Sequence, residues 1–248
     1  MTMISVCLAS HNGEKYIRRQ LESILAQLVP TDEVVVSDDS STDATLRIVQ
    51  SLEDPRIRLF PGNTFFSPVY NFEHALKQAR GDVIILADQD DVWLENRVAL
   101  VREKFRDPPH ARYLLVTDGA VVDEREQILH ESIFRLIGAG PGFWKNLWNN
   151  RYMGCCMAFS RELLEVALPF PRHLPMHDMW LGQLCERIGV TEFVPVRTLL
   201  YRKHADSQTE FQIRWQPWLQ IRRRWILATN LMKRSRTVLV REECKLKR

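Results

Sequence analysis

The N-terminal part of the chain alternates short aliphatic runs with segments of helical periodicity, and this alternation constrains the fold more than any other feature. Val34-Val35-Val36 is typical of a buried strand, whereas Glu14–Gln27 carries apolar residues at spacings of three and four. We expect strands at Met3–Ala9, Glu33–Ser37, Arg56–Phe60 and Asp82–Ala87, and helices at Glu14–Gln27, Ser41–Ser51 and Asn71–Ala79. Strands separated by single helices predict the α/β class, with a doubly wound, mostly parallel sheet.

The rest of the chain is less regular and ends in a segment of different character. Further strands are expected at Arg112–Thr117, Gly119–Val122, Met157–Phe159 and Phe193–Tyr201, and helices from Arg161 and over about Asp178–Ile188. Ile133–Asn150 is expected to be a long connection. A chain of 248 residues suits one well-buried domain with an appendage. We therefore expect one domain over residues 1–208 and a basic, Trp- and Arg-rich helical tail over residues 209–248.

Cysteine usage and hydropathy bear on where such a protein works. The five cysteines form no CxxC pair, which favours buried free thiols in a reducing compartment. The uncharged apolar stretches, such as Val83–Ala87, are far shorter than the roughly 20 residues that span a bilayer. No basic segment with a cleavage site precedes Ile4, so no secretory signal is expected. These features together predict a cytoplasmic protein.

Three polar clusters follow predicted strands: Ser10–Glu14, Asp38–Asp43 and Asp88–Asp91. In doubly wound sheets, ligands bind outside the carboxyl ends of the strands, so these clusters are expected to meet at one edge. Asp88 and Asp90 lie on the same side of an extended backbone, and carboxylates this close need a counter-charge such as Mg²⁺ or Mn²⁺. The alternative is a solvated acidic turn before a helix that starts at Trp93.

The other two clusters offer groups that suit a nucleotide. Asp39 can accept a hydrogen bond from a base N–H, and one of Ser41, Thr42 or Asp43 is expected to cap the following helix. The segment Ser10-His11-Asn12-Gly13 either contacts a base or ribose or forms a simple strand-to-helix turn. Glu14 is either a residue of this pocket or a first-turn acid that interacts with the helix dipole.

Two further residues have open roles in the second half. Asp178 precedes a predicted helix, where it is either an N-cap or a general base that accepts the proton of an attacking hydroxyl. His204 follows the last predicted strand and is either structural or a third metal ligand.

Taken in order, the motifs resemble glycosyltransferase family 2, whose members have the GT-A fold. The matching segments are VCLASHNGE (6–14), VVVSDDSSTD (34–43), GDVIILADQDDVW (81–93), GCCMAF (154–159), MHDMW (176–180) and YRKHADSQ (201–208). The likeness covers residues 3–208. The variant DQDDVW and the ending YRxH look like bacterial enzymes of surface-polysaccharide synthesis, such as rhamnosyltransferases.

This resemblance implies inverting transfer of a sugar from a nucleoside-diphosphate sugar, such as dTDP-rhamnose or a UDP-sugar, to a glycan or lipid-linked acceptor. Asp178 would be the catalytic base, and Asp90 with Asp88 would bind Mn²⁺ or Mg²⁺, with His204 as a further ligand. The nucleotide would contact Ala9, Ser10, His11, Asn12, Glu14, Asp39 and Asp88.

Two positions depart from the family pattern. His11 stands where the family often has Tyr, which weakens base stacking. Tyr70 stands where a basic residue often precedes the Asn of the helix before the acidic strand, so neutralisation of the diphosphate is expected to depend more on the metal or on Arg202.

The tail has a pattern of its own. Residues 201–248 hold 13 Lys and Arg against 4 Asp and Glu. Trp218, Ile221, Trp225, Ala228 and Met232 recur at helical spacing, so they would form one face. Either this basic amphipathic helix lies on an anionic membrane, at the inner face of the cell membrane, or it docks on the domain with solvated arginines. No nucleic-acid-binding motif is present, so nucleic acid is not expected as a partner.

Two other functions are compatible with a doubly wound sheet and acidic ligands. A sugar-nucleotide nucleotidyltransferase usually carries a Gly-rich, basic loop after its first strand, and Ser10–Glu14 lacks these features. A non-catalytic, membrane-associated nucleotide-sugar-binding protein would not need Asp39, Asp90 and Asp178 together.

Overall fold

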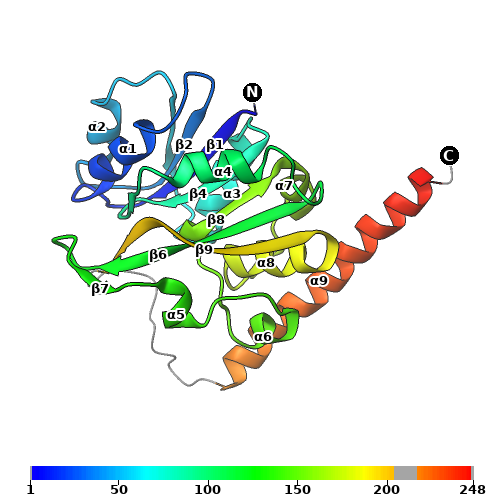
Figure 1. Ribbon diagram of the computed structural model, residues 1–248. Coiled ribbons are helices and arrows are strands. Elements are labelled where there is room, and N and C mark those ends of the chain that lie inside the picture. Colours follow the sequence, from blue (N-terminus) through cyan, green and yellow to red (C-terminus); the bar gives the residue numbers. More distant parts are fainter. Residues whose placement is uncertain (1, 204–216, 247–248) are drawn as a thin grey trace.

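The computed structural model describes residues 2–203 and 217–246, and it shows a single curled sheet flanked by helices (Figure 1). The strand order is β3-β2-β1-β4-β8-β6-β9-β5, with β7 paired to β6. The strands are β1 (Ile4–Ser10), β2 (Glu33–Asp39), β3 (Ile57–Asn63), β4 (Val83–Asp88), β5 (Val92–Trp93), β6 (Tyr113–Val122), β7 (Ile128–His130), β8 (Met157–Ser160) and β9 (Val190–Arg202). The expected α/β class with a mostly parallel sheet is confirmed.

The helices follow the strands as the sequence predicts in the N-terminal part. They are α1 (Ile17–Leu25), α2 (Thr45–Gln50), α3 (Pro68–Gln78), α4 (Arg97–Lys104), α5 (Ile133–Ile137), α6 (Phe143–Trp148), α7 (Arg161–Ala167), α8 (His177–Ile188) and α9 (Pro217–Leu246). Helix α3 packs against β1 and β2, and α1 packs against α2 and β5.

The strands β3, β2, β1 and β4 are parallel neighbours, and most of their side chains are buried in β1, β2 and β4. Continuous runs such as Val34-Val35-Val36 suit a parallel sheet that is covered on both faces. Val6 pairs with Val34 on one side and with Ile85 on the other. This register places the ends of the three strands side by side.

The second half of the chain adds the antiparallel strand β8 between β4 and β6, and β9 runs parallel to β6. The two strands expected at Arg112–Thr117 and Gly119–Val122 form one strand, β6. The connection expected at Ile133–Asn150 contains the short helices α5 and α6.

The segment after the acidic cluster differs from the prediction. A helix was expected from Trp93, but Val92 and Trp93 form β5 and pair with Leu200 and Leu199 of β9. The following helix begins only at Arg97. The pairing partner lies over a hundred residues away in the chain, so local periodicity carries no signal of it.

Helix α9 docks on the domain through one face and exposes the opposite one. Leu227, Leu231 and Val238 are buried and belong to the same hydrophobic cluster as the sheet. The predicted tryptophan face points away, with Trp218 and Trp225 exposed by 84% and 70%. In residues 2–203 and 217–246, no helix is both long and apolar enough to cross a lipid bilayer. The expected domain boundary at residues 208–209 lies outside the described residues.

Leu231→Ala is expected to lower the free energy of unfolding by about 2–5 kcal/mol, because it leaves a cavity under α9. Its neighbour Met232 is about half exposed, so Met232→Ala should change stability by less than about 0.5 kcal/mol. Urea unfolding of both variants measures the difference. Equal stability of the two variants would show that α9 is not docked in solution.

Candidate active site

The ends of β1, β2 and β4 meet at one rim of the sheet. Ala9 pairs with Ser37 of β2 on one side and with Asp88 of β4 on the other. The loops that follow these strands therefore start next to one another. The structure brings together the three polar clusters noted in the sequence.

The loop after β1 is cross-linked to both neighbouring loops. The His11 backbone N–H donates to Oε1 of Gln89 at 2.9 Å, and Nε2 of Gln89 donates to the His11 carbonyl at 2.9 Å. Asn12 has a positive φ of 48°, and its side-chain oxygen accepts from the Thr42 N–H at 2.9 Å. The loop of residues 11–12 therefore has a defined shape that side chains from both neighbouring loops maintain.

Below this loop, Asp38 and Glu14 have structural partners. Asp38 is buried and accepts hydrogen bonds from the hydroxyls of Ser10 and Ser41. The Glu14 carboxylate accepts from the Ala44 N–H at 2.8 Å, just before α2. Glu14 thus contacts the start of a helix, although that helix is α2 rather than its own. Asp43 accepts from the Thr45 N–H at 3.0 Å, but the N-cap position of α2 is Ala44, which has no side-chain cap, so the expected cap at Ser41, Thr42 or Asp43 is wrong.

Asp39 is buried at the end of β2, and its carboxylate faces the segment before α3. Its two oxygens accept from the backbone N–H groups of Phe65 at 2.7 Å and Ser67 at 3.1 Å. Nδ1 of His11 lies 2.5 Å from the Asp39 carbonyl. Each carboxylate oxygen has a second lone pair, so Asp39 retains capacity for one more donor.

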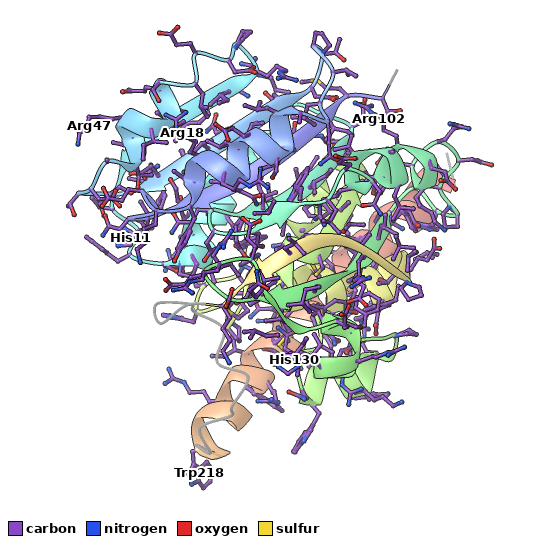
Figure 2. All side chains as sticks on the ribbon, turned by 60° about the vertical axis from the view of Figure 1, so that its left-hand side comes forward. His11, Arg18, Arg47, Arg102, His130 and Trp218 are labelled. Atoms are coloured by element: carbon purple, nitrogen blue, oxygen red, sulfur yellow. The ribbon has the colours of Figure 1, made fainter. Side chains whose placement is uncertain are left out.

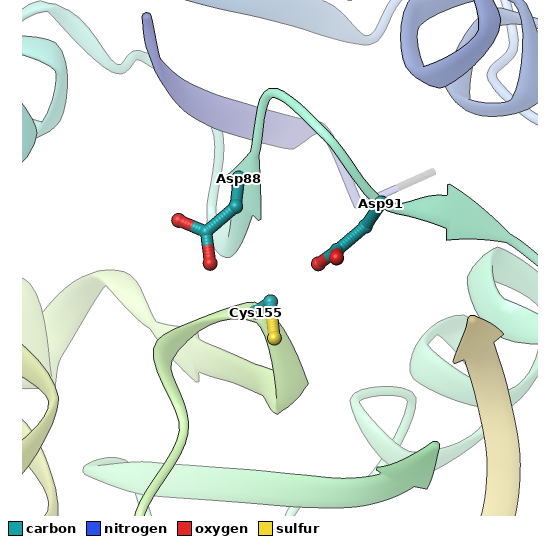
Figure 3. A group of neighbouring side chains, drawn as sticks. All are labelled: Asp88, Asp91 and Cys155. Atoms are coloured by element: carbon teal, nitrogen blue, oxygen red, sulfur yellow. The ribbon is translucent and has the colours of Figure 1, made fainter. Parts of the chain in front are cut away.

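The acidic loop between β4 and β5 contains three carboxylates in different surroundings. One oxygen each of Asp88 and Asp91 and the Sγ of Cys155 lie within 4.8 Å of one another, and the side chains converge in Figure 3. Asp91 is buried; its Oδ1 accepts from the Arg202 N–H at 3.1 Å. Its Oδ2 accepts no hydrogen bond of ordinary geometry from the described residues. Asp90 is only half-buried.

Burial and like charges perturb this cluster. Burial, then the neighbouring carboxylates of Asp90 and Asp178, raise the pKa of Asp88 to about 7. Burial and the charges of Asp90 and Asp88 raise the pKa of Asp91 well above its usual range. Clustered carboxylates with an unpartnered buried oxygen fit a divalent cation, because hard cations prefer oxygen ligands. The sequence placed Asp91 in the acidic cluster but not among the predicted ligands, and it gave no signal for Cys155.

Asp178 lies in the first turn of α8 and faces the acidic loop closely enough to raise the pKa of Asp88. It is buried and its Oδ1 accepts from Nδ2 of Asn150 at 3.1 Å. Burial raises the pKa of Asp178 to about 6. The N-cap position of α8 is Met176, which has no side-chain cap, so Asp178 is not the N-cap. A buried carboxylate with this pKa suits proton transfer near neutral pH.

The neighbouring His177 packs under the site. Its ring stacks on Phe72 with centroids 4.3 Å apart, and a Cβ at Gly154 would lie 2.8 Å from its Nε2. Glycine at position 154 is therefore needed for this close approach.

Arg202 ties the acidic loop to the β6–β7 hairpin. Its Nε donates to the Asp90 carbonyl at 3.0 Å, its Nη1 to the Glu124 carbonyl and its Nη2 to the Glu126 carboxylate, each at 2.9 Å. The guanidinium also stacks over Tyr16, 5.0 Å from the ring centroid. The buried guanidinium is thus shared among several protein groups. His204, the other predicted residue of this region, lies outside the described residues.

The raised pKa values predict how stability depends on pH. The folded-state pKa values of Asp88 (about 7) and Asp178 (about 6) exceed the usual value of about 4. Between the usual value and these raised values, the folded state therefore binds more protons than the unfolded state. Stability is therefore lost as the pH rises through 6 and 7. We expect the unfolding temperature, measured in chelator, to rise as the pH falls from about 8 to 6. Asp88→Asn should flatten this trend, and an identical trend in both proteins would contradict the assignment.

The chain belongs to glycosyltransferase family 2, because the model of that family, "Glycosyl transferase family 2", matches residues 5–168. The resemblance inferred from the motifs is confirmed.

Curated relatives agree. The chain is 32% identical over 188 residues to the Escherichia coli glucosyltransferase WfgD, covering 73% of this chain and 70% of WfgD. It is 24% identical over 245 residues to the dTDP-rhamnosyl transferase RfbG of Shigella flexneri, covering 88% and 80% of the two chains. The likeness to a rhamnosyltransferase is therefore also found. The match to another E. coli glucosyltransferase, WfaP, is 32% identical and spans 40% of this chain but only 39% of WfaP.

Solved structures share the fold. TarS of S. aureus, crystallised with UDP-GlcNAc, has a TM-score of 0.65 at 20% identity over 84% of this chain and 60% of TarS. A mannosyltransferase of Pyrobaculum calidifontis, in complex with GDP-Man and Mn²⁺, has a TM-score of 0.58 at 20% identity, covering 83% and 57%. The chain thus spans about 60% of these proteins.

Proposed function

We propose that this protein transfers a sugar, with inversion, from a nucleoside-diphosphate sugar to a glycan or lipid-linked acceptor in surface-polysaccharide synthesis. One observation carries the proposal: Asp178 is buried in the first turn of α8, close enough to the acidic loop for its charge to help raise the pKa of Asp88. A donor bound by that loop would present its sugar to Asp178.

Asp178 is the general base of the proposed reaction. It accepts the proton of the acceptor hydroxyl while that oxygen attacks the anomeric carbon and the nucleoside diphosphate leaves. A pKa of about 6 keeps it ionised at neutral pH and still basic enough to take the proton. Asn150 holds the carboxylate through its hydrogen bond to Oδ1.

The acidic loop is the proposed site of Mn²⁺ or Mg²⁺. Asp90 and Asp88 would hold the ion, with His204 as a further ligand, and Asp91 lies close to Asp88. A bound divalent cation neutralises the charge that develops on the leaving diphosphate. Arg202 supports this site by donating a hydrogen bond to the Asp90 carbonyl, which holds the acidic loop. From this position its positive charge would help to neutralise the diphosphate.

The nucleotide is proposed to bind along Ala9, Ser10, His11 and Asn12, with Asp39 and Asp88 contacting its base and ribose. The cross-linked loop supports this by fixing the backbone of residues 11 and 12. Glu14 contributes indirectly, through the start of α2. To accept a base N–H, the Asp39 carboxylate would either give up a hydrogen bond to the segment before α3 or use a remaining lone pair.

The donor is proposed to be dTDP-rhamnose or a UDP-sugar, since the names of RfbG and WfgD specify these two donors. The acceptor in the name of WfgD, a GlcNAc-diphosphoundecaprenol, suggests a lipid-linked saccharide. With such an acceptor, the proposed place of action is the cytoplasm, at the inner face of the cell membrane.

A thermal-shift screen against UDP-, dTDP- and GDP-sugars, with and without Mn²⁺, tests the proposal. A ligand that binds only the folded state raises its stability, so the true donor should raise the unfolding temperature in the presence of Mn²⁺. Asp39→Asn should weaken this shift. Slow Mn²⁺-dependent hydrolysis of the same donor distinguishes an enzyme from a non-catalytic binding protein. A chain that none of the sugars stabilises would refute the proposed donor class.

A further inference from the structure

Two helices at one end of the molecule expose four tryptophans, which we call the tryptophan surface. Trp144 and Trp148 of α6 are exposed by 78% and 74%, and Trp218 and Trp225 of α9 by 84% and 70%. Trp93 and Trp180, by contrast, are buried. Tryptophan offers a large apolar area, and several exposed together indicate an interaction site.

The two helices form one unit. The Arg224 guanidinium stacks over Trp148, 5.8 Å from the ring centroid, and its Nε donates to the Trp148 carbonyl at 2.6 Å. Figure 1 shows α6 beside the first half of α9, and Figure 2 shows Trp218 at the outermost tip of that end. The tryptophans therefore belong to the same end of the molecule.

This end is also basic. Lys145 and Arg222 are exposed between the tryptophans of their helices, and Lys233 and Arg236 are exposed further along α9. The apolar residues that dock α9, such as Leu227 and Leu231, lie on its opposite face. The outward face thus combines tryptophans with cations, the combination that suits the headgroup region of an anionic bilayer.

We propose that the tryptophan surface binds the surface of an anionic lipid bilayer. The choice of a bilayer over nucleic acid follows from the tryptophans, whose amphipathic rings are favoured at the level of lipid headgroups. The geometry also connects this surface to the candidate base: Asn150, two residues beyond Trp148, donates to Asp178. If the proposed function holds, a lipid-linked acceptor would then be presented next to Asp178; the binding itself does not depend on that function.

Vesicle sedimentation of the full chain, without donor or metal, tests the proposal. We expect the chain to sediment with vesicles of phosphatidylglycerol and phosphatidylcholine at least about tenfold more strongly than with phosphatidylcholine alone. The double variant Trp144→Ala/Trp225→Ala should lower this partitioning about tenfold. The control Ile128→Ala/Leu129→Ala removes two apolar side chains of β7 that are about half exposed, and it should bind as the parent does. A blue shift of tryptophan emission on adding vesicles gives a second readout.

Two outcomes would overturn the proposal. One is the absence of binding to anionic vesicles, and the other is a tryptophan variant that binds as strongly as the parent. If that variant kept its binding and duplex DNA competed the vesicles away, the surface would be a general polyanion site. Measuring donor hydrolysis with the same preparations distinguishes a failure of the membrane proposal from a failure of the proposed function. Hydrolysis without vesicle binding overturns only the membrane proposal. Vesicle binding without hydrolysis overturns only the proposed function.

Discussion

Asp178→Asn is expected to lower kcat about 10²–10⁴-fold, the usual contribution of a general base. The amide is nearly the same shape and can still accept from Asn150, so the first turn of α8 should keep its structure. Asparagine cannot take up the proton of the acceptor hydroxyl. Donor affinity should therefore remain nearly unchanged, and titration calorimetry with the donor and Mn²⁺ measures it alongside the steady-state rate.

Glu162→Gln is a matched control, because Glu162 is an acidic residue in the first turn of another helix, α7. It removes the same charge from an exposed position and should leave kcat unchanged. The parent should lose activity below pH 6 as Asp178 becomes protonated, since burial raises the pKa of Asp178 to about 6. Full turnover by Asp178→Asn would show that another group is the base.

The N-terminal half of the sheet was predictable because its signals are local. Runs such as Val34–Val36 indicate strands that are buried on both faces, and the polar residues after them mark the strand ends. Topology then places all such ends on one edge, which is why the clusters that contain Asp39 and Asp88 could be expected on the same rim.

The remaining features depend on contacts between distant parts of the chain. Asp91 suits the start of a helix by sequence, but it is buried and bonded to the Arg202 N–H, 111 residues away. Cys155 joins the acidic group through the packing of a segment between β6 and β8. Docking of α9 on the domain was one of the two alternatives, but its docked face was not predicted, because tryptophan spacing marks an amphipathic face without saying whether protein or solvent lies against it.

Asp90→Ala is expected to abolish the Mn²⁺-dependent part of donor binding. Asp90, like Asp88, is half-buried, whereas Asp91 is buried, so Asp90 and Asp88 lie nearer the surface, where an ion can also contact a diphosphate. Without the ion, the negative charges of a bound diphosphate and of the carboxylates Asp88 and Asp91 would lack a compensating cation. At a donor concentration of a hundred times Kd, donor and Mn²⁺ should stabilise the parent against unfolding by about 2.7 kcal/mol. The Asp90→Ala variant should lose most of this stabilisation.

Asp91→Asn tests whether Asp91 binds the ion or only supports the acidic loop. The asparagine oxygen can still accept from the Arg202 N–H, and the buried charge that burial and Asp90 disfavour is removed. If Asp91 only supports the loop, this variant should keep Mn²⁺-dependent donor binding and become no less stable. If Asp91 holds the ion together with Asp88, as their convergence with Cys155 allows, Asp91→Asn should lose the metal response as completely as Asp90→Ala. Donor affinity that neither substitution nor chelator changes would refute the metal site, because no carboxylate of the loop would then depend on an ion to bind the donor.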